Sequence, residues 1–204
     1  MDAKNRKLFE LIKSKFYQAG WIWGILQLFF ATIRKIEWMF STILYRKVLG
    51  GLGNGSVVKG RITLMYPHKI CIGDRCILGV RSVFTSENPN GDLIIEDDVS
   101  LVEGCRIDFS GGVIINKGAH LSPRCQIITH DHGWDPHSKP FFNSLKIGRE
   151  CWIGSDNIIL AGVSSIGEFA IVGAASVVTQ NVPDKAIVAG NPAKIIKYRD
   201  DKNL

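Results

Sequence analysis

The sequence predicts a parallel β-helix, a solenoid of short stacked strands, with a helical segment at its N-terminus. Three observations lead to this fold class. In successive runs, a branched aliphatic recurs every six residues between Ile72 and Val178, a small residue follows most of these aliphatics four positions later, and residues 1–50 lack this rhythm. Helical patterns repeat every 3.6 residues and strand patterns every two, so a period of six indicates one short strand and one bend per repeat. Stacked repeats of this kind bury their aliphatic side chains in one continuous interior.

The two sets of repeat positions can be read directly from the chain. The aliphatic positions are Ile72, Leu78, Ile95, Leu101, Ile107, Ile115, Leu121, Ile127, Ile147, Ile153, Ile159, Ile166, Val172 and Val178. The small positions are Cys76, Ser82, Val99, Cys105, Ala119, Cys125, Cys151, Asn157, Ala170 and Ser176. Because four of the five cysteines occupy small positions, we interpret them as core fillers rather than reactive thiols. An odd cysteine count without a Cys-x-x-Cys pair argues against a disulfide framework and favours a reducing, cytoplasmic compartment.

The tandem pattern aliphatic-Gly-x-x-small-x over residues 70–198 resembles the bacterial hexapeptide-repeat acyltransferase family. That family includes galactoside and maltose O-acetyltransferases and surface-polysaccharide O-acetyltransferases. The resemblance implies a left-handed, three-sided β-helix, a homotrimer, and acetyl-CoA bound in grooves between neighbouring subunits. It also implies an O-acetyltransferase that moves an acetyl group from acetyl-CoA to a hydroxyl of a sugar or polysaccharide precursor. A serine O-acetyltransferase and an N-acetyltransferase of an amino sugar stay open as alternatives.

The longest break in the repeat, residues 130–146, is the expected projecting loop and holds three of the five histidines. Loops held by a rigid scaffold often carry function. A base that removes a proton from a sugar hydroxyl should titrate near neutrality, which favours histidine, and it needs a partner that fixes its tautomer. Asp108, Asp131 or a main-chain carbonyl could be that partner.

The resemblance assigns the base to His132, because the segment His132-Gly-Trp-Asp-Pro is similar to the family's catalytic element and begins seventeen residues after Ile115. His130 is the alternative base. Asp108 and Trp134 are candidates for substrate binding. The family's acceptor-binding asparagine has no counterpart in residues 101–108, so the identity of the acceptor stays open.

Two other interpretations of the histidines compete with catalysis. They could bind a metal, as in carbonic anhydrases with the hexapeptide fold, and the residues that could be counted are His120, His130, His132 and His137. They could also only hydrogen-bond the loop. The C-terminal sequence described next argues against a metal-dependent or non-catalytic solenoid, and we expect no metal.

The segment 147–198 ends in VVTQNVP and GNPAKIIK, and this ending is similar to the coenzyme-binding end of the family. The resemblance implies contacts to acetyl-CoA from Ser155, Ala161, Gly162, Ala174, Thr179, Lys194 and Lys197. The two lysines would contact the phosphates, and Ala161 with Gly162 would line the thioester end. Gln180 stands where the family commonly has a basic residue.

Residues 1–50 are aromatic, and residues 1–60 hold ten Lys or Arg against three acidic residues. We expect helices at about 4–17 and 21–48, which either cap the first coil or lie on an anionic membrane surface. The apolar run 19–33 is shorter than the roughly 20 residues that cross a bilayer, and without a nucleic-acid-binding motif we expect no nucleic acid partner. The predicted divisions are a helical segment (1–50), an acyltransferase β-helix (51–198) and a C-terminal tail (199–204). The predicted location is cytoplasmic, with membrane association left open.

Overall fold

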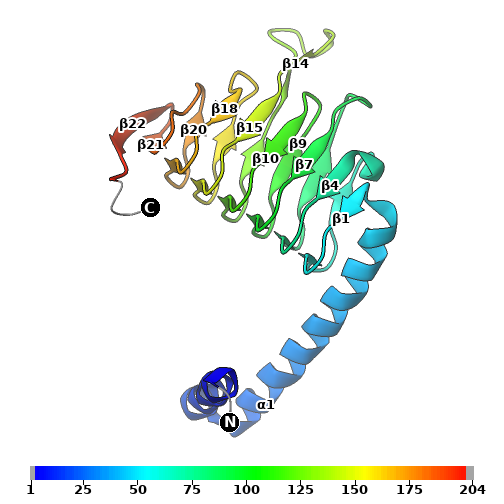
Figure 1. Cartoon of the computed structure of the whole chain (residues 1–204), viewed down its shortest axis with the longest axis vertical. Helices are drawn as coiled ribbons and strands as arrows, with labels where there is room; N and C mark the ends of the chain where they lie inside the picture. Colours follow the sequence, from blue (N-terminus) through cyan, green and yellow to red (C-terminus); the bar gives the residue numbers. More distant parts are fainter. Residues whose placement is uncertain (1–2, 201–204) are drawn as a thin grey trace. The chain divides into compact units, whose positions relative to one another are not determined.

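The structure, a computed structural model, describes residues 3–200, so the last four residues of the predicted tail lie outside the described residues. The solenoid consists of three parallel sheets, and each sheet takes every third strand of the repeat. Figure 1 shows the strands stacked coil upon coil. The predicted fold class, mainly β with stacked parallel coils and an N-terminal helical segment, is confirmed.

Each sheet forms one side of the solenoid. Sheet A contains β1 (Gly51–Leu52), β4 (Ile70–Ile72), β7 (Leu93–Ile95), β10 (Val113–Ile115), β15 (Leu145–Ile147) and β18 (Ser165–Ile166). Sheet B contains β2 (Val57–Val58), β5 (Ile77–Leu78), β8 (Ser100–Leu101), β11 (His120–Leu121), β16 (Trp152–Ile153), β19 (Ile171–Val172), β21 (Ala186–Gly190) and β22 (Ala193–Tyr198). Sheet C contains β3 (Thr63–Leu64), β6 (Val83–Thr85), β9 (Arg106–Asp108), β12 (Gln126–Ile127), β17 (Ile158–Ile159) and β20 (Val177–Val178). A short 3-10 helix, η1 (Pro67–Lys69), precedes β4.

The repeat aliphatics fill the interior of the solenoid, because all fourteen have at most 4% of their surface exposed. They stack directly on one another across neighbouring coils, as Ile115 does on Ile95 and Leu121 on Leu101. The ten small positions are buried as well, and the four cysteines among them are free thiols. Cys71, outside the repeat phase, is exposed.

The repeat continues through Phe84, where the pattern of branched aliphatics is interrupted. Phe84 lies six residues after Leu78, is fully buried, and pairs in register with Ile107 of the next coil. It therefore continues the phase with an aromatic side chain, which a search for branched aliphatics reads as an interruption. The strands β1, β2 and β3 form a further coil beneath it.

The N-terminal segment is helical from Ala3 to Val48 (α1), with one non-helical residue, Gly20, at φ 74° and ψ 151°. Glycine tolerates this positive φ because it has no Cβ. Residues 41–48 belong to the same compact unit as the solenoid, whereas residues up to Phe40 form a separate unit. The Tyr45 hydroxyl donates to the Ile62 carbonyl (2.9 Å) and accepts from the Ile62 amide (3.0 Å), and the Thr42 hydroxyl accepts from the Val58 amide (3.0 Å). These bonds satisfy backbone groups of the first coil, which has no preceding coil to pair with.

The projecting loop begins with an antiparallel hairpin of β13 (His130–Asp131) and β14 (Phe141–Phe142), which stands out from the stack in Figure 1. A second antiparallel pair, β21 with β22, ends the solenoid. Over the described residues, no helix is long and apolar enough to cross a membrane.

Candidate active site

One edge of the solenoid carries the breaks in the repeat, at the point where the chain leaves the strands of sheet C. Residues 86–92, 109–112, 128–144, 160–164 and 179–182 follow β6, β9, β12, β17 and β20 there. We call this edge the site edge. Hydrogen bonds join its successive coils, for example from the Thr129 amide to the Asp108 carboxylate (2.6 Å) and from the Asn143 side chain to the Ala161 carbonyl (2.7 Å).

Glycines allow the coils to approach closely along the site edge. Gly112 has a φ of 87°, in the region that side chains with a Cβ rarely adopt. A Cβ on Gly111 would lie 2.2 Å from the Asn143 carbonyl oxygen of the next coil, so any larger residue would push the two coils apart.

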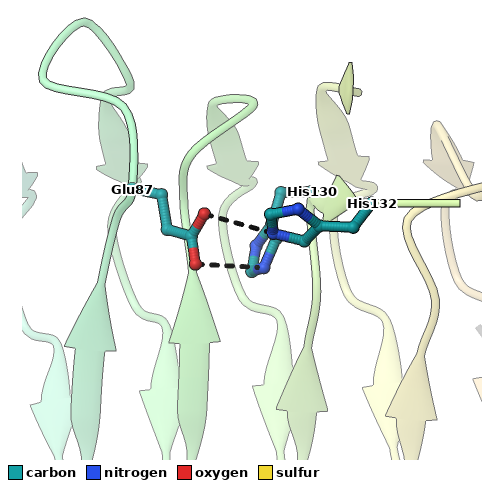
Figure 2. Close-up of side chains that lie close together, drawn as sticks. All are labelled: Glu87, His130 and His132. Carbon is teal, nitrogen blue, oxygen red and sulfur yellow. Dashed lines mark ion pairs between the residues drawn. The ribbon is translucent and has the colours of Figure 1, made fainter. Parts of the chain in front are cut away.

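Three side chains from two coils of this edge converge, as Figure 2 shows. His130 lies on β13, His132 follows it, and Glu87 comes from the loop after β6. The His130 Nε2 atom is 3.5 Å from one oxygen of the Glu87 carboxylate, and the His132 Nε2 atom is 3.4 Å from the other. The two imidazole rings meet edge to face, with 5.5 Å between their centres.

His130 is held by Asp108, whose carboxylate accepts from the His130 Nδ1 atom at 2.9 Å. Burial of the Asp108 carboxyl raises its pKa, but hydrogen bonds from Ser110, His130 and Thr129 outweigh burial and leave that pKa below its usual value. Asp108 is therefore ionised at neutral pH and can only accept hydrogen bonds. It follows that Nδ1 of His130 carries the hydrogen and that Nε2, which faces Glu87, is the free nitrogen.

His132 is held in the same tautomer by the main chain. Its Nδ1 atom lies 2.8 Å from the Ser138 carbonyl oxygen, and the Ser138 hydroxyl donates to the His132 carbonyl at 2.6 Å. A carbonyl oxygen only accepts, so Nδ1 of His132 carries the hydrogen and Nε2 has a free lone pair. This lone pair is what a general base needs. Of the partners expected from the sequence, Asp108 holds His130 and a main-chain carbonyl holds His132.

Glu87 was not predicted from the sequence, because it lies 43 positions before His130 in a loop without a recognisable motif. The signal that could have indicated it is its place, since it is an acidic residue near the start of the break in the repeat that follows Phe84. Its backbone is fixed by a bond from the Glu87 amide to the Ser110 hydroxyl (2.7 Å), and that hydroxyl in turn donates to Asp108. Glu87 and Asp108 are thus parts of one hydrogen-bonded network.

Contact of Asp108 with substrate stays a prediction. Its carboxylate is buried and accepts hydrogen bonds from Ser110, Thr129 and His130, so within this chain it holds the residues around it. Trp134 lies fully exposed in the projecting loop, and its contact with substrate stays a prediction. Within the described part of the chain, the group with metal-ligand geometry comprises Glu87, His130 and His132, and it includes neither His120 nor His137.

The predicted coenzyme residues fall on two edges of the solenoid. Ala161, Gly162 and Thr179 lie on the site edge, and Ala161 and Gly162 occupy the coil directly after the one that carries the histidines. Ser155 and Ala174 stack on the edge between sheets B and C, where the Ala175 amide donates to the Ser155 carbonyl (2.8 Å). Sheet C separates the two groups, so residues that resemble one coenzyme site are not all adjacent within a single chain.

Lys194 and Lys197 are both exposed on β22, the last strand. Residues three apart on a regular strand point to opposite faces. Here the pairing shifts, so that Lys194 lies opposite Ala189 and Lys197 opposite Ile187. Since Ala189 and Ile187 are two apart on β21 and share a face, the irregularity brings the two lysines to one side of the hairpin.

An open cleft of about 370 Å³ lies between the site edge and sheet A. Asn88 follows Glu87 in its wall, Phe142 is the hairpin partner of His130, and Ser110 belongs to the Asp108 network. Asn90, Asp92 and Lys146 add further polar groups. The cleft thus combines amide, hydroxyl and charged groups with an aromatic ring, directly beside the elements that hold the histidines.

No protein-family model matches the sequence. The chain is similar to WcaF of Escherichia coli K12, named as a colanic acid biosynthesis acetyltransferase, with 25% identity over 177 residues, 87% of this chain and 85% of the relative. It is also similar to WbbJ of the same organism, named as a lipopolysaccharide biosynthesis O-acetyl transferase, with 30% identity over 56% of this chain and 65% of the relative.

Solved structures with the same fold include AntD, an N-acyltransferase from Bacillus cereus, with a TM-score of 0.70, 18% identity, and coverage of 79% of this chain and 90% of that one. The hexapeptide-repeat acetyltransferase VCA0836 of Vibrio cholerae, complexed with acetyl coenzyme A, has a TM-score of 0.53, 25% identity, and coverage of 78% and 76%. The repeat and the three-sided fold agree with these similarities to hexapeptide-repeat acyltransferases. It is an acyltransferase.

The role of Asp108 can be tested through stability. In the variant Asp108→Asn, the donors Thr129 and His130 lose a charged acceptor, and we expect a loss of about 1–3 kcal/mol in unfolding free energy at pH 7. A carboxyl with a lowered folded pKa stabilises the protein above its unfolded pKa of about 3.9 and loses this effect as the pH falls through the folded pKa. Urea unfolding at pH 7 and pH 3 should therefore show the difference from wild type shrinking at pH 3. An equal difference at both values would contradict an ionised Asp108.

Proposed function

We propose that the protein is an O-acetyltransferase that moves an acetyl group from acetyl-CoA to a hydroxyl of a sugar or polysaccharide precursor, with His132 as general base. One observation carries this proposal. The Ser138 carbonyl fixes the hydrogen of His132 on Nδ1, so Nε2 is a proton acceptor on the site edge. The names of WcaF and WbbJ support a sugar or polysaccharide acceptor, and that of WbbJ supports transfer to oxygen.

The reaction needs no acylated residue. The acceptor hydroxyl would attack the thioester carbonyl carbon while Nε2 of His132 removes its proton. The carbon–sulfur bond then breaks, and the proton passes from the imidazolium to the departing thiolate, which leaves as coenzyme A. Main-chain N–H groups on the site edge would stabilise the oxyanion that forms on the carbonyl oxygen. His130 is the alternative base, because its Nε2 atom is free in the same way.

The arrangement of the edges supports a site for acetyl-CoA. Ala161 and Gly162 lie one coil beyond the histidines, and the Asn143 side chain ties the projecting loop to the Ala161 carbonyl. We propose that the thioester lies at these residues and that the phosphates contact Lys194 and Lys197. The complex of VCA0836 with acetyl coenzyme A supports the choice of coenzyme. The cleft lined by Asn88, Ser110 and Phe142 is the proposed acceptor site. We assign no metal to this reaction.

We also propose that the protein is a cytoplasmic homotrimer. Two edges of one chain carry the predicted coenzyme residues on either side of sheet C, so Ser155 and Ala174 of one subunit would face the site edge of its neighbour. Sedimentation equilibrium should then give three times the chain mass of 22.6 kDa.

Replacing His132 by asparagine should lower turnover by about 100- to 10,000-fold, because asparagine cannot take up the proton. Release of thiol from acetyl-CoA, measured against a panel of sugars, amino sugars, nucleotide sugars and serine, gives the rate and tells hydroxyl acceptors from amines. The matched control is His137→Asn, which removes an exposed histidine of the same loop and should keep the wild-type rate. Near-normal turnover by the His132 variant, with loss of turnover in His130→Asn, would move the base to His130.

The double variant Lys194→Ala/Lys197→Ala should weaken binding of acetyl-CoA by about tenfold at low salt, since two cations that face one side are lost. Calorimetric titration measures the dissociation constant. Lys117→Ala, which removes an exposed lysine on another coil, should bind as wild type. The defect should diminish with 3′-dephospho-CoA or in high salt. An unchanged dissociation constant for the double variant would reject the phosphate contact.

Membrane contact by the N-terminal segment is a further part of the proposal. Trp21, Trp23, Phe29 and Phe30 are more than half exposed, and Arg34 with Lys35 follows them. Aromatic side chains beside cations suit an anionic lipid surface. The protein should co-sediment with vesicles containing phosphatidylglycerol and more weakly with pure phosphatidylcholine. Trp21→Ser/Trp23→Ser should lose this binding, whereas Trp152→Ser, at an exposed site on β16, should keep it. Equal sedimentation of both variants would reject the contact.

A further inference from the structure

We propose that Glu87 is a positioning residue that aligns the two imidazoles and stabilises the positive charge that forms when His132 takes up a proton. The inference rests on the proposed function. It begins from the hydrogen bonds of the two rings. The Nδ1 atom of His130 donates to Asp108, and the Nδ1 atom of His132 donates to the Ser138 carbonyl. Both Nε2 lone pairs consequently face an acidic side chain that also only accepts when ionised.

Three acceptors without a donor repel one another, so this arrangement is most stable when a proton enters it. The proton removed from an acceptor hydroxyl is such a proton. Once it sits on Nε2 of His132, the imidazolium faces a carboxylate oxygen 3.4 Å away. That separation is longer than a formed hydrogen bond and can shorten when the proton arrives. Glu87 would thus favour the protonated base over the resting one.

The pairing of atoms fits this role. One Glu87 oxygen faces His130 and the other faces His132, so the carboxylate can accept a separate hydrogen bond from each ring once that ring is protonated. Within the described residues, the charged groups that contact the imidazoles are Glu87 from the loop after β6 and Asp108 from β9. The neighbouring Asp131 carboxylate instead accepts from the Gly133 amide (2.7 Å).

Anchoring of the Glu87 backbone supports a positioning role. The Glu87 amide donates to the Ser110 hydroxyl, and this hydroxyl donates to the Asp108 carboxylate that holds His130. The same network therefore sets the height of Glu87 on its coil and the orientation of His130 two coils later. The Glu87 carboxylate keeps about half of its surface exposed, so it can respond to a substrate that enters the site.

The test is the variant Glu87→Gln, which keeps the shape of the side chain and removes its charge. We expect kcat to fall by about 10- to 100-fold with little change in the KM for acetyl-CoA, and the acid limb of the pH–rate profile to move to lower pH. Glu87→Asp should recover part of kcat. In a His132→Asn background, Glu87→Gln should have no further effect, because the charge it stabilises no longer forms. The matched control is Glu103→Gln, which removes an exposed glutamate of another edge that pairs with Arg81.

Two outcomes would overturn the inference. One is a wild-type kcat and pH profile for Glu87→Gln in a protein whose His132→Asn variant is inactive, a result that leaves the proposed function standing. The other is a wild-type enzyme that loses turnover after dialysis against a chelator and regains it with zinc, which would make the three residues metal ligands. If His132→Asn is itself active, the proposed base fails, and this is distinguishable from a failure of Glu87.

Discussion

Burial of one aliphatic side chain per side of each coil is the constraint on which the rest of the structure depends. Leu101 and Leu121 stack in register within sheet B, as Ile107 and Ile127 do in sheet C. Full burial of such a side chain is worth about 1.5–3 kcal/mol, and a slip of one residue would turn it to solvent. Neighbouring coils are therefore fixed relative to one another, both along the solenoid axis and in rotation about it. Insertions are tolerated where they leave this pattern intact, which is at the edges.

The candidate site is a consequence of that rigid stack. Neighbouring strands in a sheet lie about 4.8 Å apart, so groups at the same edge of successive coils come within reach of one another. Glu87, Asp108 and His130 follow β6, end β9 and open the hairpin after β12, in three consecutive coils. Ala161 follows β17 in the next one. Residues distant in sequence thus form one line along the site edge, and the hairpin of β13 and β14 adds His132 at its outer side.

Much of the fold and part of the site could be predicted from the sequence, for reasons visible in particular residues. The fourteen repeat aliphatics are all buried, because a period of six brings each of them to the interior of the stacked coils. Phe84 was missed since an aromatic side chain can fill the same place. The loop with His130 and His132 was identified as a break in the period. Asp108 was one of three partners considered for the histidines, but its pairing with His130 was not predicted, and Glu87 was not identified at all. Their partners lie in other coils, and no spacing along the chain reveals them.

By itself, the sequence determined that this protein is a solenoid, which residues line its interior, and where a histidine-bearing loop leaves it. These properties follow from local periodicity, and the same pattern recurs in each repeat. Only the tertiary structure decided which side chains meet. The Ser138 carbonyl fixes the tautomer of His132, Asp108 holds His130, and the Glu87 carboxylate faces the Nε2 atoms of both rings. The reason is that the stacking of coils sets distances across the chain, and these depend on the length of every turn between them.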